Sequence, residues 1–162
     1  MAISVTHELN EIVIKVLKTR FLAAMLATVD EDGFPRIAPV SLFAVRDSKT
    51  ILMAMQKECQ SARNIRRDSK MMLSLCEEKD IAVGIKGKAT MLREMSAFKG
   101  GAIFQIEVLE VKNDAAVDVE VVSGVRMKLR NPRWLKIITA AARELDVLAG
   151  TEPLRSEDFL SF

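Results

Sequence analysis

The chain has 162 residues, enough for one domain with a sizeable core, and 49% of them are hydrophobic, which excludes a disordered chain. Lysine and arginine total 24 against 22 for aspartate and glutamate, so charge gives no general case for binding nucleic acid. No apolar run reaches the roughly 20 residues that span a bilayer. One histidine and two cysteines argue against a zinc site or a Ser-His-Asp triad, so we expect any chemistry to belong to a cofactor.

An amphipathic helix is predicted from about residue 6 to residue 18, because apolar side chains recur there at helical spacing. They are Leu9, Ile12, Val13, Val16 and Leu17. Thr6 is the expected N-cap, with Glu8 in the first turn, and His7 is expected to face solvent from this helix. Acidic residues in this segment are not typical of a signal peptide.

A strand over residues 21–29 and a tight turn at residues 30–33 are expected next, because Asp and Gly tolerate positive φ. A second strand is predicted over residues 34–45. Its prolines, Pro35 and Pro39, lack a backbone N–H, which places this strand at an edge, at a bulge or in an interrupted ladder.

Five more strands are expected, over residues 51–55, 71–76, 81–91, 104–109 and 117–122, the last three with period-2 alternation. A short helix over residues 59–68 separates the first two. A C-terminal helix is predicted at about residues 132–148, with Asn131 as N-cap, Pro132 as its first residue and Gly150 as its end. Six or seven strands with few crossover helices favour a mainly β fold, a small antiparallel barrel with flanking helices in one domain spanning residues 1–162.

The junction between the 51–55 strand and the 59–68 helix is the candidate site. The first turn of a helix has free N–H groups and a partial positive charge, so it can hold a phosphate. Ser61 can add a hydroxyl, Gln60 an amide donor, and Lys57 or Arg63 a positive charge. The alternative is that Ser61 merely caps a surface helix whose arginines form a solvated face.

Residues 24–112 resemble the FMN-binding split barrels, the superfamily of pyridoxamine-5'-phosphate oxidase. The resemblance rests on the hairpin exit Gly33-Phe34-Pro35, on the strand–helix junction, and on the small-residue strand around Gly87-Lys88-Ala89. It implies a split antiparallel β-barrel and a homodimer with FMN at its interface. It also implies hydride or electron transfer through the flavin.

The resemblance further implies which residues bind FMN. Backbone groups of two strands would lie near the flavin ring, and a polar pair with an Asn three positions on would hold the phosphate. The positions are Pro39, Val40, Ser41, Met53, Ala54, Met55, Gln60, Ser61 and Asn64, with Lys57 as a nearby cation. Many members carry a basic pair where this chain has Gln60-Ser61, so Lys57, Arg36 or Arg63 would supply the charge.

We therefore expect a cytoplasmic FMN-dependent oxidoreductase of unknown substrate, with no metal and no membrane or nucleic-acid partner. Oxidation of pyridoxamine phosphate itself is not expected, because true oxidases carry an Arg-x-His near the C-terminus and residues 152–162 do not. The alternatives are a non-enzymatic FMN-binding electron-transfer protein and a barrel that binds a deazaflavin or haem. Haem is disfavoured because His7, the one histidine, is not a plausible haem ligand.

Overall fold

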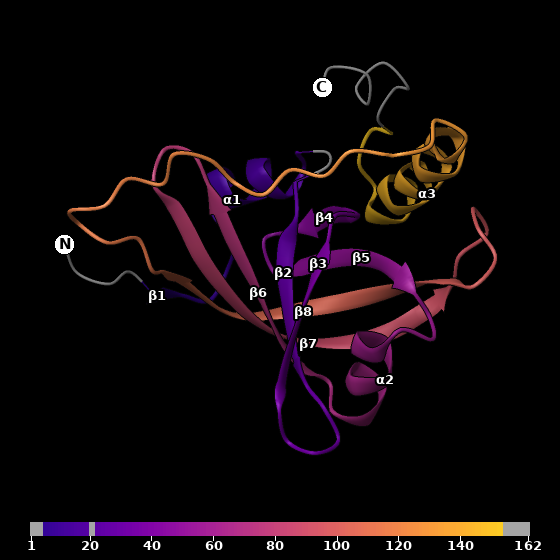
Figure 1. Ribbon diagram of the computed structural model, residues 1–162, viewed down its shortest axis with the longest axis horizontal. Helices are drawn as coiled ribbons and strands as arrows, with labels where there is room; N and C mark the ends of the chain where they lie inside the picture. The colour runs from indigo at the N-terminus through magenta and orange to yellow at the C-terminus, as the bar shows by residue number, and fades with distance from the viewer. Residues whose placement is uncertain (1–4, 20–21, 154–162) are drawn as a thin grey trace.

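The computed structural model describes residues 5–19 and 22–153, and its centre is an antiparallel eight-stranded sheet that curls into a barrel (Figure 1). The strand order is β3-β2-β6-β7-β8-β5-β4, with β1 paired to β8. The strands are β1 (Val5–Thr6), β2 (Ala24–Val29), β3 (Pro35–Val40), β4 (Phe43–Asp47), β5 (Thr50–Gln56), β6 (Lys70–Glu77), β7 (Ile81–Glu94) and β8 (Gly101–Asn113). The helices are α1 (Glu11–Leu17), α2 (Gln60–Arg67) and α3 (Trp134–Ala149). The predicted class, mainly β with flanking helices in a split barrel, is confirmed.

The barrel is open along a seam between β3 and β4, which are the two ends of the strand order and between which no ladder forms in the described residues. The prediction of one continuous strand over residues 34–45 was wrong. The chain leaves β2 at Ser41–Leu42 and then pairs with β5, so the strand is divided in two. The edge position expected from Pro35 and Pro39 is confirmed, because β3 pairs only with β2.

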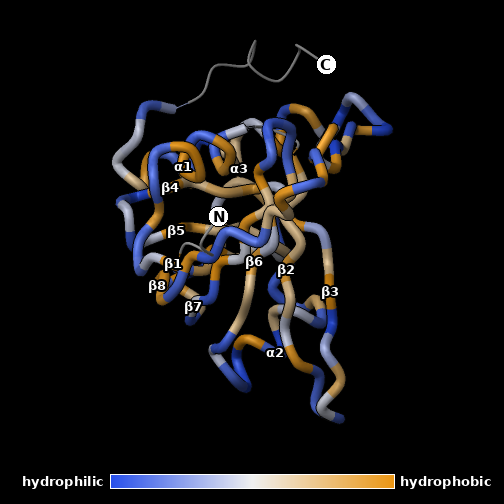
Figure 2. Tube along the Cα trace, turned by 90° about the vertical axis from the view of Figure 1, so that its left-hand side faces the viewer, coloured by the Kyte–Doolittle hydropathy of each residue, from blue (hydrophilic) through white to orange (hydrophobic). Residues whose placement is uncertain are grey.

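Alternating side chains of the long strands fill the barrel interior. The largest of them are fully buried: Leu26, Ile51, Met53, Leu73, Leu75, Ile85, Phe104 and Ile106. Helix α1 closes one end, because its Val13, Val16 and Leu17 belong to the same core. Each such side chain contributes about 1.5–3 kcal/mol of burial free energy. Helix α2 lies at the opposite end, beside the β2–β3 hairpin (Figure 1, Figure 2).

Helix α3 packs on a second, smaller core outside β4 and β5. Its buried members are Ala44, Leu52, Ala54, Met95, Ile103, Ala141, Leu145 and Ala149. The Glu144 carboxylate anchors this helix to the β7–β8 loop, because it accepts from the backbone of Ser96 at 3.0 Å and of Ala97 at 2.9 Å and pairs with Arg93 at 2.6 Å. No helix of the described residues is long and apolar enough to cross a membrane.

Both terminal helices begin later than the sequence predicts. The N-cap of α1 is Asn10, whose side chain accepts a hydrogen bond from Val13 N at 2.9 Å. Thr6, the expected N-cap, instead pairs with β8. His7 is exposed and lies before the helix, with its Nδ1 2.8 Å from Leu109 O. Pairing with β8 gives the backbone of Thr6 hydrogen-bond partners that the first turn of a helix would not provide.

At α3, the expected N-cap Asn131 and first residue Pro132 lie in the preceding turn, where Asn131 Oδ1 accepts from Arg133 N at 3.0 Å. The helix itself begins at Trp134. Its predicted end at Gly150 is confirmed, because that residue is the C-cap with φ of 72°.

The strand predicted over residues 117–122 was wrong. Val117, Val119 and Val122 are 77%, 65% and 80% exposed and lie in the irregular β8–α3 connection, residues 114–133. Alternation alone does not form a strand when no neighbouring strand offers its edge. The connection is instead held on the β6–β7 turn, where Val121 N donates to Asp80 Oδ1 at 3.1 Å.

Candidate functional site

The N-terminus of α2 lies just after the end of β5, and no described side chain caps it. Cys59 is the N-cap residue and makes no side-chain hydrogen bond to the first turn, which also contains no acidic residue. The first N–H groups of a helix have no partner within the helix. Ser61 lies in this turn, is buried, and has no hydroxyl hydrogen bond to any described residue. The first turn of α2 therefore combines uncapped N–H groups with a hydroxyl that is hydrogen-bonded to no described residue.

Asn64 uses its polar atoms within the protein. It is 1% exposed, and its amide nitrogen donates to Thr28 Oγ1 at 2.9 Å and to Asp30 Oδ1 at 2.7 Å. Its oxygen accepts from Gln60 Nε2 at 3.0 Å and from Arg67 Nη1 at 3.2 Å. Asn64 thus joins α2 to β2 and to the hairpin turn.

The Asp30 carboxylate accepts hydrogen bonds from Arg36 as well as from Asn64. Arg36 Nε lies 2.9 and 2.8 Å from the two carboxylate oxygens, and Arg36 Nη2 lies 2.7 Å from Oδ2. The hydrogen bond from Arg36, followed by that from Asn64, lowers the pKa of Asp30 to about 2. Arg36, one of the cations considered for the phosphate, is therefore held by a carboxylate that stays ionised.

Three other cations gather around residues 57–60, the loop that enters α2. Lys57 Nζ pairs with Glu94 Oε1 at 2.7 Å, and this contact raises the pKa of Lys57. Arg63 donates to Glu58 O at 2.5 Å and to Gln60 Oε1 at 2.6 Å. Arg66 donates to Lys57 O at 2.7 Å and lies 3.4 Å from Glu58 Oε2. Positive charge therefore surrounds the start of α2.

The residues expected along the flavin ring lie at the seam. Met53 and Ala54 are buried; Met53 pairs with strands on both sides, and Ala54 N donates to Leu42 O at 3.0 Å. Met55 is half-buried and lies two positions after Met53, where the ladder between β4 and β5 ends. The junction residues expected to bind FMN are Pro39 (exposed), Val40 (buried) and Ser41 (half-buried). Since Leu42 follows Ser41, this junction lies beside Ala54.

Among the partners of the expected site residues that sequence analysis missed are Thr28 and Glu94. Glu94 lies 37 positions from Lys57, and Thr28 lies 36 positions from Asn64. No local pattern marks either residue, because strand pairing alone brings them to the site. No group of three or more His, Cys, Asp or Glu side chains in residues 5–19 and 22–153 is placed to hold a metal ion.

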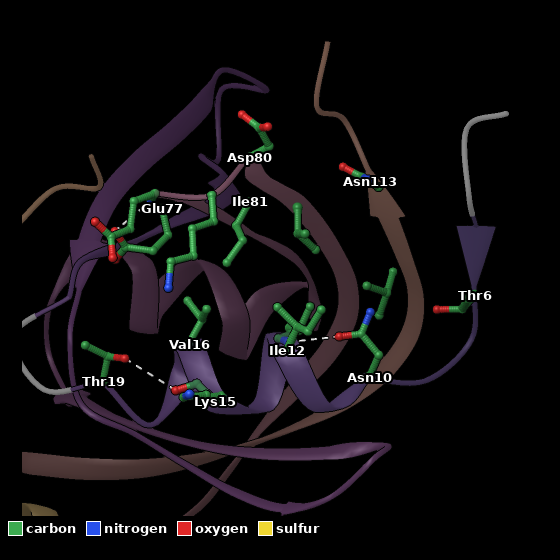
Figure 3. A pocket seen from close by; sticks show the side chains of 15 residues that line it. Thr6, Asn10, Ile12, Lys15, Val16, Thr19, Glu77, Asp80, Ile81 and Asn113 are labelled. Carbon is green, nitrogen blue, oxygen red and sulfur yellow. Dashed lines mark hydrogen bonds between the residues drawn. The ribbon is translucent and has the colours of Figure 1, made fainter. Parts of the chain in front are cut away.

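A cavity of about 480 Å³ lies elsewhere, between α1, the β6–β7 turn and the end of β8 (Figure 3). Val16 and Ile81 face each other across it, with Glu77 and Asp80 at its rim (Figure 3). Glu77 Oε2 lies 2.5 Å from Arg126 Nη2 and so anchors the β8–α3 connection. None of the residues expected to bind FMN lines this cavity.

Comparison with known proteins identifies the family. The family model described as pyridoxamine 5'-phosphate oxidase matches residues 11–123. A candidate pyridoxamine 5'-phosphate oxidase from Lactobacillus delbrueckii is 23% identical, with TM-score 0.58 over 68% of this chain and 98% of that chain. An F420 reductase is 17% identical, with TM-score 0.52 over 60% and 93% of the two chains. An FMN-binding protein from Syntrophomonas wolfei is 14% identical, with TM-score 0.51 over 60% and 80%.

The curated protein sequences contain no match. At these identities the similar structures show the fold alone, whereas the family model covers the chain from α1 to the β8–α3 connection. The chain therefore belongs to the pyridoxamine 5'-phosphate oxidase family.

Proposed function

We propose that the protein binds FMN at the α2 end of the barrel and acts as a flavin-dependent oxidoreductase. The observation that carries the proposal is the uncapped first turn of α2, with Ser61 buried in it. A helix N-terminus with free N–H groups and a hydroxyl is suited to a terminal phosphate. FMN ends in such a phosphate, whereas riboflavin does not.

The charges around this turn fit an anion. Lys57, Arg63 and Arg66 surround residues 57–60, and among the described residues two carboxylates, Glu58 and Glu94, form ion pairs with them. Three cations against two carboxylates leave an excess of positive charge, to which the helix dipole adds. The site therefore contains cations even though Gln60 and Ser61 are uncharged.

The open seam supports a shared site. Pro39, Ser41 and Met55 border it and are at least partly exposed in the single chain. We propose that a second copy of the chain covers this seam, in the symmetric dimer that the family resemblance implies. When bound there, FMN would supply hydride or electron transfer at its ring. The residues of this chain would hold its phosphate, orient its ring and exclude water.

The test is the cofactor that the purified protein carries or takes up. We expect flavin absorbance, release of FMN on denaturation, and calorimetric affinity for FMN well above that for riboflavin. Ser61→Ala should weaken FMN binding about tenfold, the size of one lost hydrogen bond to a charged group, and leave riboflavin binding unchanged. Ser74→Ala, on the exposed face of β6, is the control. Equal affinities for FMN and riboflavin would refute the phosphate assignment.

A deazaflavin is the second candidate cofactor. It is favoured by the uncharged pair Gln60-Ser61 and by the fold shared with an F420 reductase. Binding of F420 in preference to FMN would select it. An enzyme and a non-enzymatic carrier differ in turnover: steady oxidation of NADH or NADPH by the FMN-loaded protein supports the oxidoreductase, and a retained flavin without turnover supports the carrier.

A further inference from the structure

We propose that Glu94 is a specificity-determining residue: it acts as an exchangeable counter-ion that holds Lys57 until a phosphate takes its place. The proposal rests on the proposed function, because it concerns how the same site recognises the phosphate of FMN. It assigns a role to a residue at the end of β7 that no sequence pattern marks.

The ion pairs around α2 differ in how firmly they are held. Asp30 is 13% exposed and bonds Arg36 at several points and Asn64 at one. The Glu94 side chain is 62% exposed and makes one polar contact with the described residues, to Lys57 Nζ. A multiply bonded, ionised carboxylate does not release its arginine readily, whereas an exposed single-contact pair stabilises the protein little. Arg66 also forms a loose ion pair, at 3.4 Å from Glu58, but its guanidinium is bonded to the carbonyl of Lys57 as well. Lys57 is therefore a cation that an incoming anion can recruit.

Two hydrogen bonds hold the backbone of Lys57, whereas one exposed ion pair holds its side chain. Its N–H donates to Gly100 O at 2.8 Å, and its carbonyl accepts from Arg66 at 2.7 Å. The residue lies two positions before the N-cap Cys59, so its flexible four-carbon side chain starts close to the first turn of α2. Moving the ammonium from Glu94 to a phosphate needs rotation of side-chain bonds only.

This exchange favours anionic ligands. A phosphate replaces the Glu94 carboxylate as the partner of Lys57, and the released carboxylate is already mostly in water. A ligand without a phosphate has nothing to offer the ammonium and leaves the pair intact. Removing the charge of Glu94 should therefore strengthen binding of FMN without affecting riboflavin.

The experiment is Glu94→Gln, with FMN and riboflavin affinities measured by calorimetry at low and high salt. We expect FMN affinity to rise about threefold, as for loss of one exposed ion pair, with riboflavin affinity unchanged and the gain reduced by salt. Glu110→Gln is the control, because Glu110 also forms an ion pair with a lysine, Lys86, at 2.8 Å. It should leave both affinities unchanged.

The role of Lys57 is tested in the same series. Lys57→Gln should weaken FMN binding, and Glu94→Gln should give no gain in that background. A gain that persists without Lys57, or unchanged FMN affinity in Glu94→Gln when the wild type binds FMN, overturns this inference and leaves the proposed function standing. Absence of FMN binding by the wild type overturns both.

Discussion

The two ends of the barrel are closed in different ways. At the α2 end, polar side chains bond across elements, and Asn64 alone joins a helix, a strand and a turn. At the α1 end, Val13 and Val16 close the barrel and leave a cavity of about 480 Å³. The cavity and the uncapped helix start therefore lie at opposite ends. Pockets are the usual first choice for a ligand site, whereas the site that we propose lies at the α2 end, away from this cavity.

The polar groups of the two ends also differ in whether they have hydrogen-bond partners within the chain. At the α1 end, Glu77 and Asp80 accept hydrogen bonds or ion pairs from the β8–α3 connection, so they act within the chain. At the α2 end, the Ser61 hydroxyl remains without a partner in the described residues. We infer that substitutions at the α2 end alter ligand binding, and that substitutions at the α1 end alter stability only.

The largest effect is expected from Asn64→Asp. The new carboxylate would replace a donor that lies 2.7 Å from Asp30, so two like charges would face each other in a largely buried place. We expect a loss of about 3 kcal/mol of unfolding free energy at pH 7 and weaker FMN binding. Thermal denaturation and calorimetry measure the two effects.

Acidification should partly restore Asn64→Asp, because protonation removes the repulsion. The control is Asn113→Asp, the same change at an exposed position. Its side-chain oxygen, which accepts from Ala115 N, is retained in aspartate. Wild-type stability of Asn64→Asp at pH 7 would contradict the buried network.

The next effect is expected at the other end, from Gly124→Ala. A Cβ at this position would lie 2.4 Å from Cys76 O and 3.1 Å from Glu77 Oε2. Backbone cannot yield as a flexible side chain does, so the β8–α3 connection must shift, at a cost of about 2 kcal/mol. FMN affinity should stay unchanged, and Ser123→Ala serves as the neighbouring control. A Gly124→Ala variant that loses FMN binding would show that the two ends are coupled.

Local chemistry explains what the sequence predicts correctly. The Asp30–Gly33 turn forms because Gly33 adopts φ of 87°, and β3 lies at an edge because Pro35 and Pro39 cannot donate. The short helix α2, with Ser61 in its first turn, is likewise predicted from residues that are adjacent in the sequence. In each case the determining groups lie within a few positions of one another.

Pairing between distant segments explains the errors and omissions. The valines of residues 117–122 alternate as in a strand but find no strand edge, so Val117, Val119 and Val122 stay exposed. Asn64 was expected to bind the phosphate, yet its donors are used by Thr28 and by Asp30, which lies 34 positions away. Sequence alone named candidate site residues but could not show which of them already had partners within the chain.

Acid should weaken both ends, since each holds a carboxylate with a lowered pKa. The pKa of Asp30 falls from 3.8 to about 2, chiefly through Arg36. Burial opposes ionisation of Glu77, but the N–H of Glu78 and the Arg126 guanidinium outweigh it and lower its pKa. A lowered folded-state pKa stabilises the protein above the ordinary value, and this stabilisation is lost as pH falls through the folded-state value.

We therefore expect the thermal midpoint of the wild type to fall as the pH decreases from about 4 towards 2. Asp30→Asn and Glu77→Gln should each flatten this dependence and lower the midpoint at neutral pH. Only Asp30→Asn should also weaken FMN binding, because Asp30 is bonded to Asn64 at the α2 end. An acid profile unchanged in both variants would mean that other carboxylates determine it.

The smallest effect, and the most direct test of which end binds the flavin, is expected from Ile81→Trp. Ile81 is half-buried at the β6–β7 turn and faces Val16 across the cavity (Figure 3). An indole there would fill much of the space between α1 and the turn, without touching any residue at the start of α2. Affinity for FMN should therefore match the wild type, whereas Ser61→Ala weakens it. The reverse result, loss of FMN binding in Ile81→Trp with none in Ser61→Ala, would place the flavin in the cavity at the α1 end and refute the phosphate site at α2.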